Sequence, residues 1–193
     1  PLLRRRRRHC HNTAATEPFT VEVEVPAETY SELPLLITEL SPNSKGGGTD
    51  YYEFFELYNN TNQPMNLANY SFVYKYTDTG SELPFQVPAV ILEPQEELVF
   101  WYNNGNRTLA AFNENFGLAL TESQVVEFKD VFPGFANGGN RALVIKDAEG
   151  ADIVSASYLG SDNDNNGAGI DYLFPSSGTE MLKLEGLAAP TPG

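Results

Sequence analysis

The sequence predicts an all-β protein, an antiparallel β-sandwich with one short helical insertion. Apolar and polar residues alternate over many short stretches, which is typical of strands that bury one face. Clusters of Asn, Asp, Gly and Pro separate these stretches at modest spacing, as turns do between the strands of a sandwich. The chain has 193 residues, enough for one domain whose core needs no disulfide.

Nine stretches have the length and composition of strands. In the most aromatic of them, residues 52–59, aromatic residues stand on both faces, so we interpret them as core rather than as a sugar-stacking surface. A further alternating stretch, "FTVEVEV" at residues 19–25, predicts an extra edge strand, because charges at alternate positions suit an exposed edge. The nine strand candidates are residues 35–40, 52–59, 70–76, 89–92, 97–103, 125–128, 142–147, 152–159 and 181–186.

One stretch has the spacing of a helix. In residues 106–120 the apolar side chains Leu109, Phe112 and Phe116 follow one another at intervals of three and four residues, which places them on one face of a short helix. We expect this helix to be an insertion whose apolar face plugs one end of the sandwich.

Shifts in composition divide the chain. Residues 1–18, with the run Arg4–Arg8, are predicted to be a disordered basic tail, and residues 19–33 an extra strand and linker. The sandwich domain is expected at residues 34–186. A linker to a further domain is predicted at residues 187–193, because the ending "AAPTPG" is typical of interdomain linkers. The arginine run also matches a nuclear-localisation or polyanion-binding patch, which is the less favoured interpretation.

The charge of the chain limits its partners. Removing the five arginines Arg4–Arg8 from the net charge of −14 leaves −19 on the remainder. So acidic a domain repels phosphate backbones, which makes nucleic acid a poor direct partner. Basic surfaces, cations and neutral polymers are better candidates. No apolar run is long enough to cross a bilayer.

The residue types exclude several kinds of catalysis. His9, Cys10 and His11 are the only histidines and cysteine, and all three lie in the basic tail. The domain itself therefore cannot form a Ser-His-Asp triad, a Cys-His pair or a zinc site with His or Cys ligands. A glycosidase needs only two facing carboxylates, such as Glu53 or Glu56 with a partner, but solvated strand-edge charges explain these acids more simply. We expect no enzyme and no cofactor.

One loop predicts a metal ion, Ca²⁺ in a structural role. The stretch "SDNDNNGAGID" at residues 161–171 reproduces the first half of a calcium-binding loop, in which oxygen ligands at alternate positions converge on the ion. Its twelfth position holds Leu173 instead of glutamate, so a true EF-hand is excluded. An ordinary polar hairpin loop is the favoured alternative. The candidate calcium ligands are Asp162, Asp164, Asn166 and Asp171.

Four motifs in a fixed order carry a family resemblance. They are "ITEL" at 37–40, "YEFFELYNNTNQPMNLANYSF" at 52–72, "LEPQEELVFW" at 92–101 and "RALVIKDAEGADIVSA" at 141–156. Together the sequence resembles a lamin-tail domain (LTD) of the bacterial type over residues 34–185. The resemblance implies an immunoglobulin-like sandwich that acts as a non-catalytic attachment in secreted or surface proteins. In such proteins it often lies beside a phosphoesterase, nuclease or other hydrolase domain.

We therefore predict a binding or positioning module of a secreted or cell-surface bacterial protein, with a protein or a cell-surface polymer as partner. Two alternatives stay open: an accessory domain of a metal-dependent phosphoesterase or nuclease on the same parent chain, and a calcium-stabilised carbohydrate-binding module that uses Tyr51, Trp101 or Tyr158. Polar loops that project from a rigid sandwich are the usual binding positions. The candidate binding residues are Asn59, Asn60, Asn103, Asn104 and Arg107.

Overall fold

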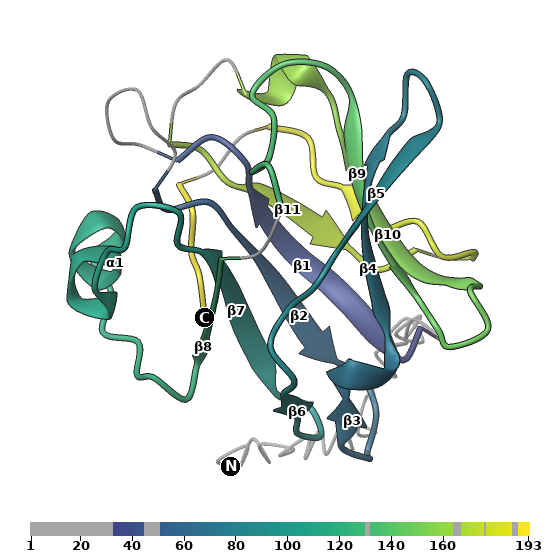
Figure 1. Cartoon of the computed structure of the whole chain (residues 1–193), viewed down its shortest axis with the longest axis horizontal. Coiled ribbons are helices and arrows are strands. Elements are labelled where there is room, and N and C mark those ends of the chain that lie inside the picture. Colours follow the sequence, from purple (N-terminus) through teal and green to yellow (C-terminus); the bar gives the residue numbers. More distant parts are fainter. Residues whose placement is uncertain (1–32, 45–50, 130–131, 164–166, 176, 187–188) are drawn as a thin grey trace, which may run out of the picture.

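Two sheets, antiparallel except for one pair of strands, face each other in the computed structural model of the chain (Figure 1). The structure describes residues 33–44, 51–129, 132–163, 167–175, 177–186 and 189–193. The predicted basic tail and the predicted strand at 19–25 lie outside these residues. The predicted class, an immunoglobulin-like all-β sandwich with one short helix, is confirmed.

The larger sheet has six strands in the order β12-β11-β1-β2-β7-β8. Neighbouring strands are antiparallel except for β7 and β8, which run parallel. Along the sheet they are β12 (Leu182–Lys183), β11 (Ile170–Leu173), β1 (Leu35–Ser41), β2 (Phe54–Asn59), β7 (Glu97–Tyr102) and β8 (Val125–Phe128).

The smaller sheet has four antiparallel strands in the order β10-β9-β4-β5. Its edge strand β5 contains Pro84, which an edge tolerates because a missing N–H there costs no ladder bond. A separate short pair joins β3 (Met65–Asn66) to β6 (Ile91–Leu92). The four strands are β10 (Asp152–Tyr158), β9 (Arg141–Lys146), β4 (Ser71–Tyr76) and β5 (Ser81–Phe85).

Aromatic side chains fill the space between the two sheets. Phe55 of β2 stacks on Phe100 of β7 with ring centroids 4.9 Å apart, and both lie against Phe72 of β4. The hydroxyls of Tyr74 and Tyr158 are 3.0 Å apart and satisfy each other inside the core. The aromatic stripe of the sequence is therefore core, as predicted.

A bulge in β1 decides which residues of this strand face the core. The pairing of β1 with β2 shifts between Ile37 and Glu39, so that Thr38 is the extra residue. Ile37 and Leu40 consequently both contribute to the core between the sheets, whereas strict alternation would place them on opposite faces. Glu39 is left on the outer face of the six-stranded sheet, opposite Glu56 of β2.

The one α-helix among the described residues, α1 (Leu109–Phe116), packs on the outer face of the six-stranded sheet. Thr108 caps its first turn by accepting from the Ala111 N–H, and Gly117 ends it in the left-handed conformation. Phe112 contacts Phe54 of β2 and Trp101 of β7, forming a second apolar cluster. The expectation that the helix plugs an end of the sandwich is therefore wrong, because the outward residues of β2 and β7 are themselves aromatic. Two short 3₁₀ helices, η1 (Leu67–Asn69) and η2 (Gly160–Asn163), complete the described elements.

Candidate functional site

Two glutamates are buried side by side on the outer face of the six-stranded sheet. Glu39 of β1 and Glu56 of β2 are directly paired in register and only 2% and 5% exposed. The Thr38 hydroxyl donates to Oε1 of Glu56 at 2.7 Å. We call this pair of carboxyl groups the glutamate shelf.

The end of the chain covers the glutamate shelf. The Thr191 N–H donates to Oε2 of Glu39 at 3.1 Å, and the Gly193 N–H donates to Oε2 of Glu56 at 2.6 Å. Pro192, between the two donors, is buried. Residues 189–193, which we call the C-terminal strap, thus lie against the sheet, and Figure 1 marks their end with the letter C.

Burial makes both carboxyl groups of the shelf weaker acids than an exposed glutamate. It raises the pKa of Glu39 to about 8, helped by the charges of Glu56 and Asp171 and opposed by the hydrogen bond from Thr191. Burial likewise raises the pKa of Glu56 to about 7, against the hydrogen bond from Gly193 and with the help of Glu97. Carboxyl groups that titrate near neutral pH can serve as general acids, but here the strap occupies the position that a substrate would need.

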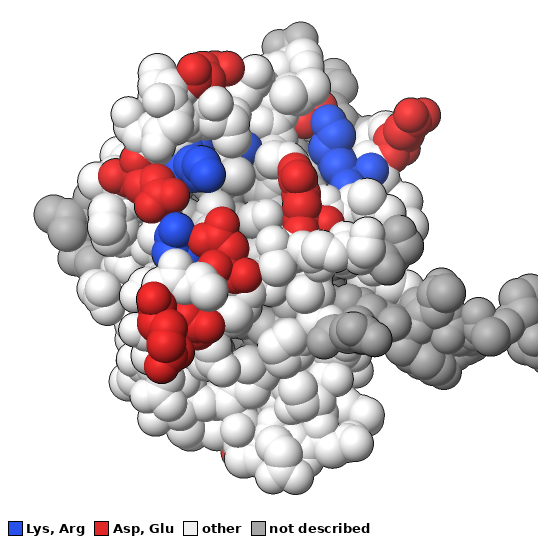
Figure 2. Space-filling model, turned by 90° about the vertical axis from the view of Figure 1, so that its right-hand side faces the viewer, with Lys and Arg blue, Asp and Glu red and all other residues white. Residues whose placement is uncertain are grey.

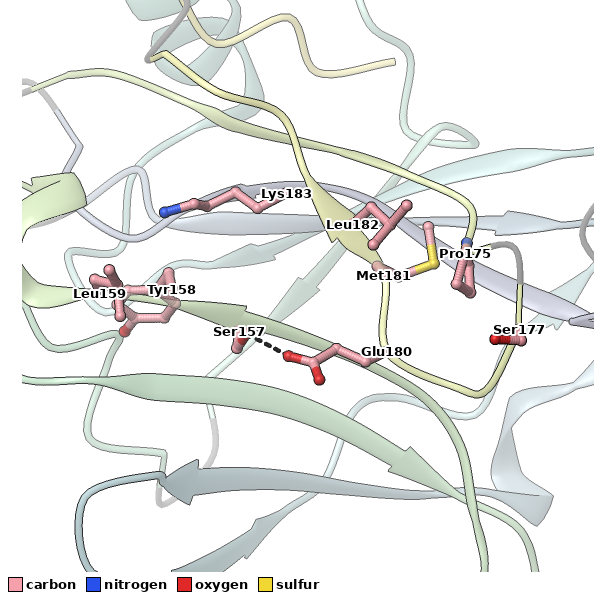
Figure 3. A pocket seen from close by; sticks show the side chains of 9 residues that line it. All are labelled: Ser157, Tyr158, Leu159, Pro175, Ser177, Glu180, Met181, Leu182 and Lys183. Carbon is pink, nitrogen blue, oxygen red and sulfur yellow. Dashed lines mark hydrogen bonds between the residues drawn. The ribbon is translucent and has the colours of Figure 1, made fainter.

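A groove opens between β10 and the segment that leads into β12 (Figure 3). Its volume is 570 Å³. In Figure 3, Tyr158 and Leu159 lie at one end of the groove and Pro175 and Ser177 at the other, with Met181 and Leu182 on the β12 side between them. Tyr158 and Met181 are buried, while Leu159 and Leu182 are exposed. The groove therefore has apolar walls that water can reach.

Three polar side chains that line the groove are already hydrogen-bonded: Ser157, Glu180 and Lys183. The Ser157 hydroxyl donates to Glu180 at 2.7 Å, the dashed line of Figure 3. Lys183 pairs with Asp162, its Nζ lying 2.8 and 2.7 Å from the two carboxylate oxygens. Few polar groups are thus left to recognise a polar ligand.

Two exposed leucines, Leu159 and Leu182, line this groove, and Leu182 has a further exposed leucine beside it. Leu173 of β11 pairs with Leu182 of β12, so their side chains lie on the same face of the sheet. Among the residues that the structure describes, the exposed large hydrophobic side chains other than Ile91 all lie between positions 159 and 184: Leu159, Leu173, Phe174, Leu182 and Leu184.

The predicted binding residue Asn59 lies inside the protein. Its side-chain amide donates to the carbonyls of Gln63, Leu92 and Glu93, and its oxygen accepts from Thr61. The amide of Asn60 donates to the Leu33 carbonyl. Both side chains therefore hold the polar corner after β2 together, and Asn59 presents no polar atom to solvent.

The second predicted binding loop divides into buried and exposed residues. Asn103 is buried and exchanges two hydrogen bonds of 2.7 Å with the backbone of Arg107. The Arg107 guanidinium lies over the Tyr51 ring, 4.4 Å from its centroid. Arg107 and Asn104 are exposed, and Arg107 lines a second cavity of 240 Å³ beside α1. Only these two of the predicted residues in this loop reach solvent.

Of the four predicted calcium ligands, the structure describes Asp162 and Asp171. Asp162 is paired with Lys183 and also accepts from the Leu159 N–H at 2.7 Å. Asp171 lies on β11, opposite Glu39 of the shelf. Asp164 and Asn166 lie outside the described residues, so calcium binding stays a prediction. Lys183 already neutralises the carboxylate of Asp162, which makes Asp162 a weaker calcium ligand.

Two of the three aromatic residues predicted to stack on sugars are buried. Trp101 and Tyr158 are each 1% exposed. The Trp101 indole N–H donates to the Tyr51 carbonyl, and the Tyr158 hydroxyl contacts that of Tyr74. The expectation that they form an exposed platform is wrong, because their rings belong to the two apolar clusters. Tyr51 is half-buried beneath Arg107.

The outer face of the four-stranded sheet carries charges of both signs (Figure 2). Lys146 bridges Glu82 and Asp152, and Arg141 lies near Asp78. Figure 2 shows acidic and basic side chains interleaved on this face, with no continuous basic stripe of the kind that tracks a phosphate backbone. Among the helices that the structure describes, none is long and apolar enough to cross a membrane.

Comparison with known proteins decides the family. The profile of the Lamin Tail Domain matches residues 28–160. The chain belongs to the lamin tail domain family. YvnB of Bacillus subtilis (strain 168), described as uncharacterized, is 33% identical over 168 residues, which cover 82% of this lamin tail domain chain and 13% of YvnB. Lamin tail domains are non-enzymatic, immunoglobulin-like binding or structural modules.

The sandwich of this lamin tail domain extends past the matched residues. Strands β11 and β12 follow residue 160, and β11 pairs with β1 in the middle of the larger sheet.

Sequence reasoning did not find the glutamate shelf, because it interpreted Glu56 as a solvated charge. One signal was present: Glu56 shares a strand face with Phe54, which must be covered.

Proposed function

We propose that this lamin tail domain is a non-catalytic binding and positioning module of a secreted or surface bacterial protein, and that it binds a protein partner in the groove between β10 and β12. The observation that carries the proposal is that two exposed leucines, Leu159 and Leu182, line this groove. Exposed apolar side chains that line a groove with polar neighbours are typical of protein interaction sites.

The chemistry of the groove favours a protein over a polysaccharide. A sugar needs hydrogen-bonding groups that are free to meet its hydroxyls, yet Glu180 is bonded to Ser157 and Lys183 to Asp162. Leu159 and Leu182 offer only apolar contact. An apolar side chain of a partner protein would replace the water that now covers both leucines, which is favourable by about 25 cal/mol per Å².

Site-specific cross-linking tests this function. A photoreactive residue is placed at Leu182, and a control one at Ile91, which is equally apolar and exposed but lies on β6. Each chain is irradiated on intact source cells, and the captured protein is identified, purified and titrated against the domain. We expect capture from position 182 and at least tenfold weaker binding by Leu159→Ser/Leu182→Ser, with Ile91→Ser unchanged. If the original chain, Leu159→Ser/Leu182→Ser and Ile91→Ser all bind the captured protein equally well, the groove is not the binding site.

The alternative function, an accessory role beside a hydrolase, rests on the family resemblance alone. Under this alternative, too, we expect the isolated domain to catalyse no hydrolysis. The isolated domain is incubated with a phosphodiester and a phosphomonoester substrate at pH 5 to 9, with and without divalent metal ions. We expect no hydrolysis above that of a heat-treated sample. Turnover that Glu56→Gln abolishes would overturn the non-catalytic assignment.

A further inference from the structure

The C-terminal strap fits the glutamate shelf as a ligand fits a site. Its two donors, the N–H groups of Thr191 and Gly193, are two residues apart and meet carboxylates on adjacent strands. Pro192 lies between them and has no N–H that would need a partner. Because proline already restricts the backbone to an extended conformation, little conformational entropy is lost when the segment binds.

Two glycines make the close approach of the strap sterically feasible. A Cβ atom at Gly169 would overlap the Glu39 carboxylate and lie 3.1 Å from the Cα of Pro190. A Cβ atom at Gly193 would lie 2.5 Å from a methyl group of Leu120, and Gly193 has a φ of +91°, which residues with a side chain rarely adopt. Glycine at positions 169 and 193 thus leaves the space that the contact between the strap and the sheet requires.

We propose that the glutamate shelf is a binding site for a short extended Thr-Pro-Gly segment, which the C-terminal strap fills in cis, and that the segment binds together with protons taken up by Glu39 and Glu56. This site is on the outer face of the six-stranded sheet, distinct from the groove between β10 and β12. The proposal therefore goes beyond the proposed function and does not depend on it.

Proton uptake follows from what surrounds each carboxyl group. Glu39 is faced by Glu56, by Asp171 of β11 and by the strap, while Glu56 is faced by Thr38, by Glu97 of β7 and by the strap. The neighbouring ionisable groups are acids, so two ionised glutamates beneath the strap repel them and one another. The strap also removes water from both carboxylates. Burial outweighs the two N–H donors in the bound state.

Binding of the strap weakens as the pH rises. The pKa values of Glu39 and Glu56 in the bound state, about 8 and about 7, lie above the ordinary 4.5. A raised pKa for an acid means that the bound state holds more protons than the released state. Binding of the strap is consequently strongest at acidic pH, weakens as the pH rises above 4.5, and is lost as it passes through 7 to 8.

The first experiment follows the strap in the full chain by NMR. The amide signals of Thr191 and Gly193 report their hydrogen bonds between pH 5 and pH 9. We expect both signals to move to random-coil positions with a midpoint between pH 7 and pH 8. Glu39→Gln/Glu56→Gln should keep both signals at their bound positions at pH 9, since amides do not ionise, while the exposed control Glu149→Gln should titrate as the original chain does. Signals of the original chain that stay unchanged across this range would overturn the proposal.

The second experiment does not depend on the folding of the glutamine variant. Thr191→Pro removes the N–H that binds Glu39 and should release the strap in the otherwise complete chain. A synthetic peptide of residues 189–193, amidated at its end, is then titrated into this variant. We expect binding at pH 6 that is at least tenfold weaker at pH 9, and no binding of the same peptide with proline in place of threonine. Absence of binding at pH 6, or equal binding at both pH values, would refute the site.

Discussion

The side chain of Asn59 is a structural tie at the polar corner after β2. It is completely buried and satisfies three backbone carbonyls and the Thr61 side chain and N–H. The sequence suggested a surface role because asparagine is common in exposed loops. A corner that folds back on itself must satisfy its own backbone groups, and one amide side chain does this for several of them.

Replacing Asn59 should therefore affect stability. Asn59→Ala leaves these carbonyls without their donor, and we expect it to lower the free energy of unfolding by about 3 kcal/mol. The control Asn62→Ala removes an exposed side chain that accepts a long hydrogen bond from Gln95 at 3.4 Å, and it should change the free energy of unfolding by less than about 0.5 kcal/mol. Urea denaturation measures both. Equal effects would contradict the structural role of Asn59.

A substitution of Asp162 tests whether the polar loop after β10 is a calcium site or an ordinary hairpin loop. In the structure it pairs with Lys183 and accepts from the Leu159 N–H, contacts that need no metal ion. Asp162→Ala should then lower the free energy of unfolding by about 1 kcal/mol equally in chelator and in millimolar calcium. The exposed turn acid Glu149 supplies the matched control, Glu149→Ala. If Asp162 is a calcium ligand, the loss will instead be larger in calcium than in chelator.

At the scale of elements, α1 is held by its aromatic face. Phe112 is fully buried and contacts Phe54, Trp101 and Phe116, in a cluster separate from the core between the sheets. Its own hydrogen bonds cannot hold so short a helix, since isolated helices of fewer than about 12 residues are marginal in water. The helix therefore depends on the outer face of β2 and β7.

Phe112→Ala should consequently destabilise the whole domain. We expect a loss of about 4 kcal/mol in the free energy of unfolding, the cost of removing a buried phenyl ring and leaving a cavity. Thermal unfolding and the intensity of the Trp101 fluorescence follow the change, because Trp101 is the one tryptophan of the chain. Glu114→Ala, on the exposed side of the same helix, should change stability little. Similar losses for both variants would argue against the packing described for α1.

At the scale of the whole molecule, the net charge of −14 opposes compactness. The described ion pairs, such as that of Lys146 with Asp152, engage few of the acids. Raising the salt concentration from about 0.01 M to about 0.15 M shortens the screening length from about 30 to about 8 Å. We expect Tm to rise by a few degrees, in NaCl and KCl alike. A fall in Tm would mean that attractive surface pairs outweigh the repulsion.

The sequence predicted much of the fold because the fold is recorded in local patterns. Alternation located eight of the twelve described strands with boundaries near those observed, and β12 within a longer candidate. Strand β5 was missed because Pro84 interrupts its pattern, which only its position at the edge of the sheet allows. The binding residues were harder to predict, since polarity alone does not distinguish a buried, saturated asparagine such as Asn103 from an exposed one such as Asn104.

By itself, the sequence determined the class of fold, the aromatic core and the family, because each depends on residue order over short distances. Only the tertiary structure decided where the helix packs and which acids are buried. The bulge at Thr38 turns Glu39 outward, and the strap that covers it comes from 152 residues further along the chain. No periodic pattern reports a contact across that separation, because burial of a carboxyl group depends on what the rest of the chain places above it.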